Sequence, residues 1–235
     1  MDTLYLVMPA YNEEENIEQV VRSWYAVLDA ASPESRLVVA DSGSADRTHE
    51  ILEALREELP QLEILEDTEK QHGPKLIALY RLAIERKADY VFQTDSDGQT
   101  EPKEFRAFWE RRERYDAIFG HRADRGDGWQ RAAVERTVCL LLRRYFGVKV
   151  PDANAPFRLM KTEALAKYLD RLPEDYALPN IMLTAFFASG DDHILFREIT
   201  FRERARGVNS IDAGKIARIG VDSLRDFRQF RKDYF

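Results

Sequence analysis

Residues 88–99, ADYVFQTDSDGQ, join an apolar run to two closely spaced carboxylates. The run is typical of a buried strand, and Asp95 and Asp97 follow it with one residue between them. Like charges this close repel each other, so we expect a cation between them. Gln99 adds a third oxygen, and oxygen ligands without His or Cys favour Mg²⁺ or Mn²⁺. The alternative is an ordinary Asp-Gly turn capped by Asp95.

In the first half of the chain, short apolar runs alternate with longer amphipathic ones. We predict strands at 4–8, 36–41, 62–66, 88–95 and 116–122, and helices at 16–30, 47–59, 75–87 and 102–115. Strands rich in Val, Ile and Leu that alternate with helices predict an α/β fold, with a mostly parallel sheet covered on both faces. Ligands of such sheets bind beyond the carboxyl ends of the strands. We therefore expect Asp41, Asp95 and the turn at 8–12 on one edge.

The second half is less regular. A helix is predicted at 128–147, and the segment PDANAPFRLM at 151–160 follows it. Further helices and one strand at 193–201 precede a helical, basic tail at 213–235. We place a soft boundary near residue 122, between a first part at 1–122 and a second part at 123–235. No linker rich in Pro, Gly or Ser lies there, so both parts are expected to belong to one continuous domain.

Composition excludes several classes of protein. A net charge of −7 over 235 residues argues against a general nucleic-acid binder. The single cysteine, Cys139, allows no internal disulfide and fits a reducing compartment. The N-terminus has no basic segment typical of a secretory signal, and no apolar stretch approaches the ~20 residues that cross a bilayer. We expect a cytoplasmic protein, peripheral at most on the inner face of a membrane.

Four motifs follow one another in an order and spacing that resemble family 2 glycosyltransferases. They are VMPAYNEEENI (7–17), VVADSGSADRT (38–48), HGPKLIAL (72–79) and QTDSDGQ (93–99). The resemblance continues through GHR (120–122), DANAPFRLMKTEAL (152–165) and RARGVNSI (204–211), and is closest to the dolichyl- or polyprenyl-phosphate mannosyltransferases. It implies a GT-A fold, a nucleotide diphosphate sugar as donor, and Mg²⁺ or Mn²⁺ at the DxD motif. The first part of the chain would bind this donor, and the second part the acceptor.

The resemblance assigns donor-binding residues to the first half. Those expected to bind the donor nucleotide and its phosphates are Pro9, Tyr11, Glu13, Asp41, Lys75 and Asp95, and the expected metal ligands are Asp95, Asp97 and Gln99. The family often has a second Asp after Asp41, where this chain has Ser42, so GDP-mannose and a UDP-sugar both stay open as donors. Without the resemblance, residues 12–16 read as a helix cap, and Lys75 as a solvated residue of a first helical turn.

Arginines in the second half match the phosphate-acceptor branch of the family. Those expected to bind an acceptor phosphate are Arg122, Arg131, Arg136, Arg158 and Arg204. The chain departs from the family at Ala155-Pro156, where Ser-Gly is usual, and at Ile211, where Lys is common. The residues expected to take part in catalysis are Asp97, Arg122, Arg131 and Asp152.

The family implies a single displacement at the anomeric carbon, with inversion. A lipid phosphate is ionised near neutrality, since its second pKa is about 6, and needs only steering arginines. A sugar hydroxyl needs a general base, for which Asp152 and the Glu174-Asp175 pair are candidates. We favour the phosphate acceptor and keep the hydroxyl acceptor as the alternative. A nucleotidyltransferase would carry a glycine-rich loop after the first strand, which PAYNEEEN lacks, and a non-catalytic sugar-nucleotide-binding scaffold stays open.

The C-terminal segment carries apolar residues at near-helical spacing with basic residues between them. The apolar residues are Ile216, Ile219, Leu224, Phe227, Phe230 and Tyr234. A basic amphipathic helix can lie on an anionic membrane surface. It can equally pack on its own sheet, on a second copy of the chain or on a membrane partner protein.

Overall fold

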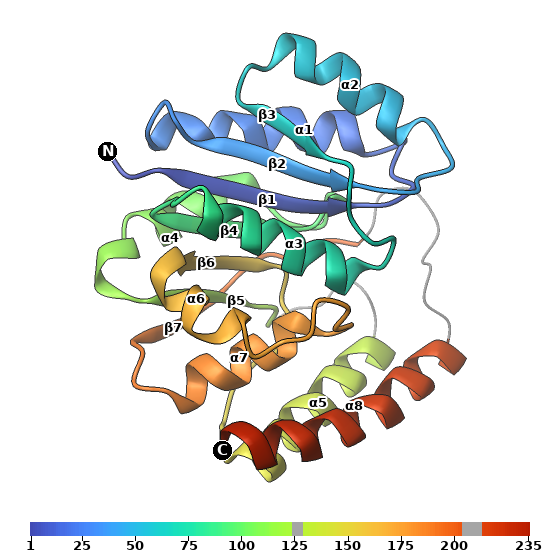
Figure 1. The fold of residues 1–235 in the computed structure, drawn as a ribbon, viewed down its shortest axis with the longest axis vertical. Coiled ribbons are helices and arrows are strands. Elements are labelled where there is room, and N and C mark those ends of the chain that lie inside the picture. Colours follow the sequence, from blue (N-terminus) through green and yellow to red (C-terminus); the bar gives the residue numbers. More distant parts are fainter. Residues whose placement is uncertain (124–128, 204–212) are drawn as a thin grey trace.

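The computed structural model describes residues 1–123, 129–203 and 213–235, with the backbone alone for 129–130 and 213–223. Its centre is a seven-stranded sheet with the order β3-β2-β1-β4-β6-β5-β7 (Figure 1). The strands are β1 (Leu4–Ala10), β2 (Arg36–Asp41), β3 (Leu62–Leu65), β4 (Tyr90–Thr94), β5 (Ala117–His121), β6 (Phe157–Lys161) and β7 (Ile194–Glu198). All pairs are parallel except the two that β6 makes with β4 and β5. The predicted α/β class and mostly parallel sheet are confirmed.

Helices cover both faces of the sheet. The α-helices are α1 (Ile17–Tyr25), α2 (Thr48–Glu58), α3 (His72–Glu85), α4 (Phe105–Trp109), α5 (Trp129–Phe146), α6 (Thr162–Leu169), α7 (Pro179–Ser189) and α8 (Ala213–Tyr234). One face packs against α1, α2 and α4, and the other against α3, α6 and α7, which lie in front of the sheet in Figure 1. Successive residues of β2 serve opposite faces, since Leu37 and Val39 join the first layer while Val38 and Ala40 join the second. Both faces are apolar, which is why the strands read as continuous hydrophobic runs.

β6 is a strand that the sequence did not predict. It comes from the second half of the chain and lies between β4 and β5, so both halves contribute to one sheet. Phe157 and Leu159 point to the α1 layer, whereas Met160 points to the α3 layer. Arg158 interrupts the apolar pattern between them and hides the strand from a reading based on hydrophobicity. The helix predicted at 102–115 is also shorter than expected, with α4 flanked by two 3-10 turns at Pro102–Glu104 and Arg112–Arg114.

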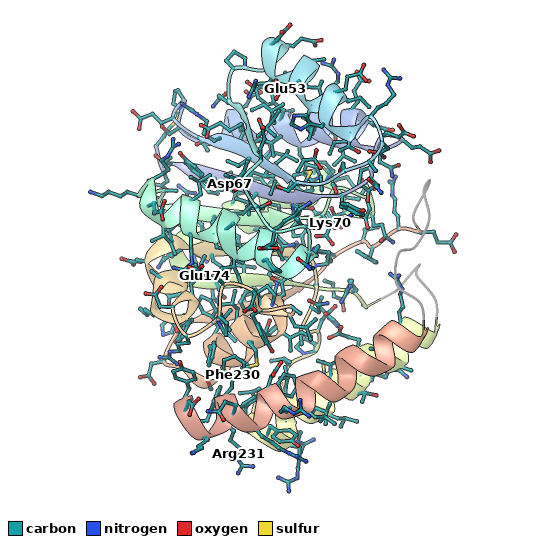
Figure 2. The ribbon with its side chains drawn as sticks, turned by 45° about the vertical axis from the view of Figure 1, so that its right-hand side comes forward. Glu53, Asp67, Lys70, Glu174, Phe230 and Arg231 are labelled. Atoms are coloured by element: carbon teal, nitrogen blue, oxygen red, sulfur yellow. The ribbon has the colours of Figure 1, made fainter. Side chains whose placement is uncertain are left out.

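The described part of α8 packs on the protein itself. Phe227 and Phe230 are buried, and their rings lie 5.4 Å from Phe146 and 5.3 Å from Tyr176, respectively. Figure 2 shows Phe230 on the side of α8 that faces the body, with Arg231 pointing away from it. The apolar stripe is therefore partnered by the domain over these residues, and the basic residues face solvent. Within the described residues, no helix is long and apolar enough to cross a membrane.

Candidate active site

The parallel strands β1, β2 and β4 bring three segments to one edge of the sheet. Ala10 is paired with Asp41 at the ends of β1 and β2. Asp95 follows the end of β4, and the next residue, Ser96, donates its hydroxyl to the carbonyl of Pro9 at 2.9 Å. The predicted convergence of these loops on one edge is therefore what the structure shows. Ser96 is buried, whereas Asp95 and Asp97 on either side of it are half-buried.

The loops after β1 and β2 are bonded to each other. The Asn12 side-chain oxygen accepts from the backbone N–H of Ala45 at 2.8 Å, and the Asn12 N–H donates to Ser44 Oγ at 3.0 Å. Asn12 adopts a left-handed backbone conformation (φ 54°), which small polar side chains tolerate best among non-glycine residues. Glu13 is buried and accepts from Asn16 Nδ2 at 2.9 Å. This interlocking gives this edge of the sheet a fixed shape.

Lys75 is buried at the same edge rather than solvated. Its side chain is only 1% exposed, and Nζ donates to the carbonyls of Ala10 at 2.6 Å and Ser42 at 3.1 Å. The ammonium thus joins the ends of β1 and β2. Removal from water lowers its pKa, although the nearby charge of Asp41 opposes the shift. Tyr11 lies beside this cation, with its ring 5.4 Å from Lys75 Nζ and 4.7 Å from Lys70 Nζ.

Asp95 has a partner that the sequence did not single out. His72, the first residue of α3, places Nε2 3.3 Å from Asp95 Oδ1, and Gln93 Nε2 donates to the same oxygen at 3.2 Å. Desolvation lowers the pKa of His72, but the hydrogen bond and charge of Asp95 outweigh it and raise the pKa. The signal for His72 was its place in HGPK, three residues before Lys75. A histidine at this point supports the Asp95 carboxylate and has a second nitrogen for a ligand.

Asp97 and Gln99 belong to a tight turn built on Gly98. Gly98 has φ +75°, a conformation that glycine adopts without a Cβ penalty, and the Gln99 N–H donates to Asp97 Oδ1 at 3.1 Å. Gln99 Nε2 donates to the carbonyl of Arg202 at 2.6 Å. This bond fixes the orientation of the Gln99 amide and leaves its carbonyl oxygen as an acceptor. Asp95, Asp97 and Gln99 offer only hard oxygens, a donor set that fits Mg²⁺ or Mn²⁺.

Arg122 and Asp152, both expected to act in catalysis, are bonded to each other. Arg122 Nε donates to Asp152 Oδ2 at 2.8 Å and Nη2 to Oδ1 at 2.9 Å. Arg122 Nη2 also lies 3.3 Å from Glu135 Oε2 of α5. Burial raises the pKa of Asp152, but the hydrogen bonds and charge of Arg122 outweigh it and hold the pKa below its usual value. A carboxylate held in this way is a poor proton acceptor.

The expectation that Arg158 binds an acceptor phosphate is wrong for the structure as folded. Its side chain is 0% exposed, and its nitrogens donate to the carbonyls of Ala153, Ala155 and Asn180 and to Thr184 Oγ1, at 2.6 to 3.0 Å. The guanidinium also lies 4.8 Å from the ring of Phe119. Burial lowers its pKa to about 10. Arg158 ties β6 to α7 and has no surface on which to meet a ligand.

The other acceptor residues are placed less closely. Arg131 lies in the first turn of α5 and is half-buried, whereas Arg136 is exposed one turn further on. Arg204 lies outside the described residues, as do Gly207, Ser210 and Ile211. Glu174 and Asp175, the other candidate bases, are exposed, and Glu174 Oε1 lies 3.8 Å from Arg81 Nη2 of α3.

A family model described as Glycosyl transferase family 2 matches residues 5–169. The chain belongs to this family. An undecaprenyl-phosphate mannosyltransferase of Micrococcus luteus is 26% identical over 93% of the chain and 91% of the relative. Two undecaprenyl-phosphate 4-deoxy-4-formamido-L-arabinose transferases are 27% identical (Edwardsiella ictaluri) and 26% identical (Pseudomonas aeruginosa), over 70% and 94% of the chain. The chain spans only 50% and 64% of these two relatives.

Two solved structures share the overall fold of this chain. Glucosyl-3-phosphoglycerate synthase from Mycobacterium tuberculosis, in complex with Mn²⁺ and uridine-diphosphate-glucose, has a TM-score of 0.70 over 96% of this chain and 79% of that chain, at 21% identity. S. aureus TarS (1–349) has a TM-score of 0.59 over 85% of this chain and 60% of that chain, at 19% identity. The GT-A fold expected from the motifs is confirmed.

Two of the family 2 departures noted in the sequence, Ser42 and Ala155, make contacts within the fold. Ser42, in place of a second Asp, bonds the backbone carbonyl of Glu66 and lies 2.7 Å from Thr68 Oγ1. It therefore anchors the chain after β3 to the end of β2. Ala155, in place of Ser, is buried and supplies its carbonyl to Arg158. Glu135, which pairs with Arg122, was missed because it lies in a helix with no motif around it.

Proposed function

We propose that this family 2 glycosyltransferase moves a sugar from a nucleotide diphosphate donor to a polyprenyl phosphate, with inversion at the anomeric carbon. The observation that carries the proposal is the pairing of Asp152 with Arg122. The pairing makes Asp152, one of the candidate bases of the second half, a poor proton acceptor, and so favours an acceptor that is already ionised. The relatives whose names contain undecaprenyl-phosphate support the same acceptor class.

The donor is proposed to lie across the ends of β1, β2 and β4. Asp41 is buried at the end of β2 and would accept a hydrogen bond from a ring N–H of the base. The Tyr11 ring would lie against the base. Asp95, Asp97 and Gln99 would hold Mg²⁺ or Mn²⁺, which when bound neutralises charge that develops on the leaving diphosphate. Lys75 fixes the strand ends that carry Tyr11 and Asp41. His72 would hold the Asp95 carboxylate in one orientation and present its other nitrogen to the donor.

The acceptor argument depends on which group needs a proton removed. A hydroxyl acceptor requires a carboxylate with a pKa near the working pH, and the pKa of Asp152 is shifted the other way. Glu174 is exposed and paired with Arg81. A phosphate monoester carries its nucleophilic charge at neutral pH and needs positioning cations alone. Arg131 and Arg136, on α5, are the described arginines that remain candidates for that role.

A polyprenyl phosphate would be met at a membrane surface, so peripheral attachment belongs to the proposal. Exposed basic residues of α8, with Arg225, Arg228, Arg231 and Lys232 among the described ones, offer a surface for anionic lipid. The helix need not insert Phe227 and Phe230 for this, because both rings are already buried against the domain. The attachment would then be electrostatic and sensitive to salt.

The test compares polyprenyl phosphate with the matched polyprenol, which has the same chain and no phosphate. The protein is incubated with GDP-mannose and a panel of UDP-sugars, with Mn²⁺ or Mg²⁺ and each lipid in detergent. We expect a glycosylated lipid and free nucleoside diphosphate from the phosphate alone, and neither from Asp97→Ala. Equal transfer to polyprenol or to a sugar hydroxyl would contradict the acceptor. Donor binding without turnover on any acceptor would favour a non-catalytic scaffold.

A further inference from the structure

Three side chains near the end of β2 lie close enough together to bind one metal ion. His49 and Glu53 lie four residues apart on α2, and so share one helix face. Glu66 follows the end of β3. One ligand atom from each of the three lies within 4.8 Å of the others. None of the three belongs to the DxD cluster, and the proposed function does not use them.

His49 is oriented by a buried carboxylate. Its Nδ1 lies 3.3 Å from Asp41 Oδ2, and the Asp41 side chain is almost completely buried. A carboxylate at Nδ1 favours the tautomer with the proton on that nitrogen, which leaves the lone pair of Nε2 for a metal. Ligating histidines in proteins almost always donate their other N–H to a carboxylate or carbonyl in this manner. Asp41 therefore supplies the supporting contact that such a site requires.

One carboxylate oxygen of Glu53 is suited to bind a cation. Its Oε1 is buried and has no hydrogen-bond partner among the residues that the structure describes, while Oε2 is bonded to Arg56. A buried carboxylate oxygen with no donor is costly, because the water that it loses is not replaced. A metal ion beside His49 would satisfy that oxygen.

Glu66 is held near the other two by its backbone. Its carbonyl accepts from Ser42 Oγ, which fixes the chain after β3 against the end of β2. The Glu66 side chain is exposed. Metal bonds of about 2.0 to 2.2 Å bring ligand atoms roughly 3 to 4 Å apart, so a rotation of the exposed Glu66 side chain would close the cluster while His49 keeps its contact with Asp41.

We propose that His49, Glu53 and Glu66 form a second divalent-metal site, which takes Zn²⁺. One imidazole nitrogen and two carboxylate oxygens form a three-ligand set that zinc accepts, with water in the fourth position. The set differs from the all-oxygen cluster at Asp95, Asp97 and Gln99, which favours Mg²⁺ or Mn²⁺. We therefore expect the His49 cluster to bind Zn²⁺ and the Asp95 cluster to bind Mg²⁺ or Mn²⁺.

The proposed zinc site is connected to the proposed donor-binding site through the contact between His49 and Asp41. A metal on Nε2 makes the Nδ1–H a stronger donor, and so holds the Asp41 carboxylate more firmly where the donor base is expected. This consequence rests on the proposed function. The binding of Zn²⁺ itself does not, and it is measured without any donor or acceptor.

The experiment uses the full chain, stripped with a chelator and dialysed against Zn²⁺ with excess Mg²⁺ to fill the oxygen site. We expect about one Zn²⁺ retained per chain, and a loss of affinity of at least about 10-fold in His49→Gln, Glu53→Gln and Glu66→Gln. Co²⁺ in place of Zn²⁺ should give a visible absorption band that His49→Gln removes. Circular dichroism checks that each variant is folded.

Three control variants separate this site from the rest of the molecule. Glu57→Gln changes an exposed acid on the same helix, His72→Gln removes the imidazole beside Asp95, and Asp97→Asn disables the DxD cluster. All three should retain Zn²⁺. Failure of the unmodified chain to retain Zn²⁺, or loss of Zn²⁺ in any of these controls to the same degree as in His49→Gln, would overturn the proposal.

Discussion

Arg122 and Asp152 face each other through two side-by-side hydrogen bonds, of 2.8 and 2.9 Å, in a pair whose side chains are only 6% and 2% exposed. Asp152 also accepts from the backbone N–H groups of Arg122 at 3.2 Å and Asn154 at 3.0 Å. The pair connects the end of β5 to the chain that leads into β6. It thus holds together the two segments that would form the acceptor side.

Removing one member of this pair should destabilise the protein strongly. Asp152→Ala removes the bidentate partner of the buried Arg122 charge, which also contacts Glu135, and such a change costs about 3–5 kcal/mol of unfolding free energy. Urea denaturation measures the loss. The control is Glu110→Ala, which breaks an exposed pair with Arg106 and should cost about 1 kcal/mol or less. Equal losses in the two variants would mean that the buried pair contributes no more than a surface one.

The same pair predicts a particular pH dependence. Because the folded-state pKa of Asp152 lies below the usual 3.8, its stabilising contribution is complete above that value and is lost as the pH falls through the folded pKa. The difference in unfolding free energy between the unmodified protein and Asp152→Asn should therefore stay constant from about pH 7 to pH 5, and shrink only below about pH 4. A difference that changes near neutrality would show a raised pKa, and would reopen Asp152 as a base for a hydroxyl acceptor.

The fold was predictable where the chain repeats one local pattern. Strands β1, β2 and β4 are continuous apolar runs that end in polar turns, and that pattern depends only on neighbouring residues. β6 was not predictable in this way, since Arg158 occupies an inward position that sequence periodicity assigns to an apolar residue. The cost of burying this charge is offset by hydrogen bonds to the carbonyls of Ala153 and Asn180, which only the folded chain brings together.

The site was predictable to a similar extent. Asp41 ends β2, and Asp95 and Asp97 follow β4, so their shared edge follows from parallel topology. Pairings across long stretches were not visible in the sequence. Arg122 binds Asp152, which lies thirty positions away in the sequence. Motif matching assigned both residues to catalysis without showing that their side chains are bonded to each other.

Arg158 should be needed for folding and not for acceptor binding. Arg158→Lys keeps the charge but loses most of the four hydrogen bonds, and leaves buried carbonyls unpaired at a cost of at least about 2 kcal/mol. Thermal or urea unfolding measures this. Arg136→Lys, on the exposed face of α5, should change stability by less than about 0.5 kcal/mol. A stable Arg158→Lys with a raised KM for the acceptor would restore the role that the sequence suggested.

Gly73 should not tolerate a side chain. A Cβ at this position would lie 2.3 Å from the carbonyl oxygen of Tyr176 and 2.5 Å from that of Ala177. Gly73→Ala should therefore lower the unfolding free energy by about 1–3 kcal/mol and weaken donor binding, because the start of α3 carries His72 and Lys75. Helix propensity alone predicts the opposite, a gain of up to about 1 kcal/mol. Unfolding curves decide between the two signs, and a stabilised variant would contradict the close packing.

Phe227 distinguishes a helix that packs on its own domain from one that inserts into a membrane. Its ring is 1% exposed and lies among Tyr145 and Phe146 of α5, so Phe227→Ala should cost about 3–5 kcal/mol of unfolding free energy in the absence of lipid. Leu140→Ala is the matched control, because Leu140 is 64% exposed on α5 and its loss should cost less than about 0.5 kcal/mol. Were Phe227 instead a membrane anchor, Phe227→Ala would leave stability unchanged and weaken binding to anionic vesicles. Measuring unfolding and vesicle sedimentation on both variants separates these outcomes, since a buried ring affects the first and an inserted ring only the second.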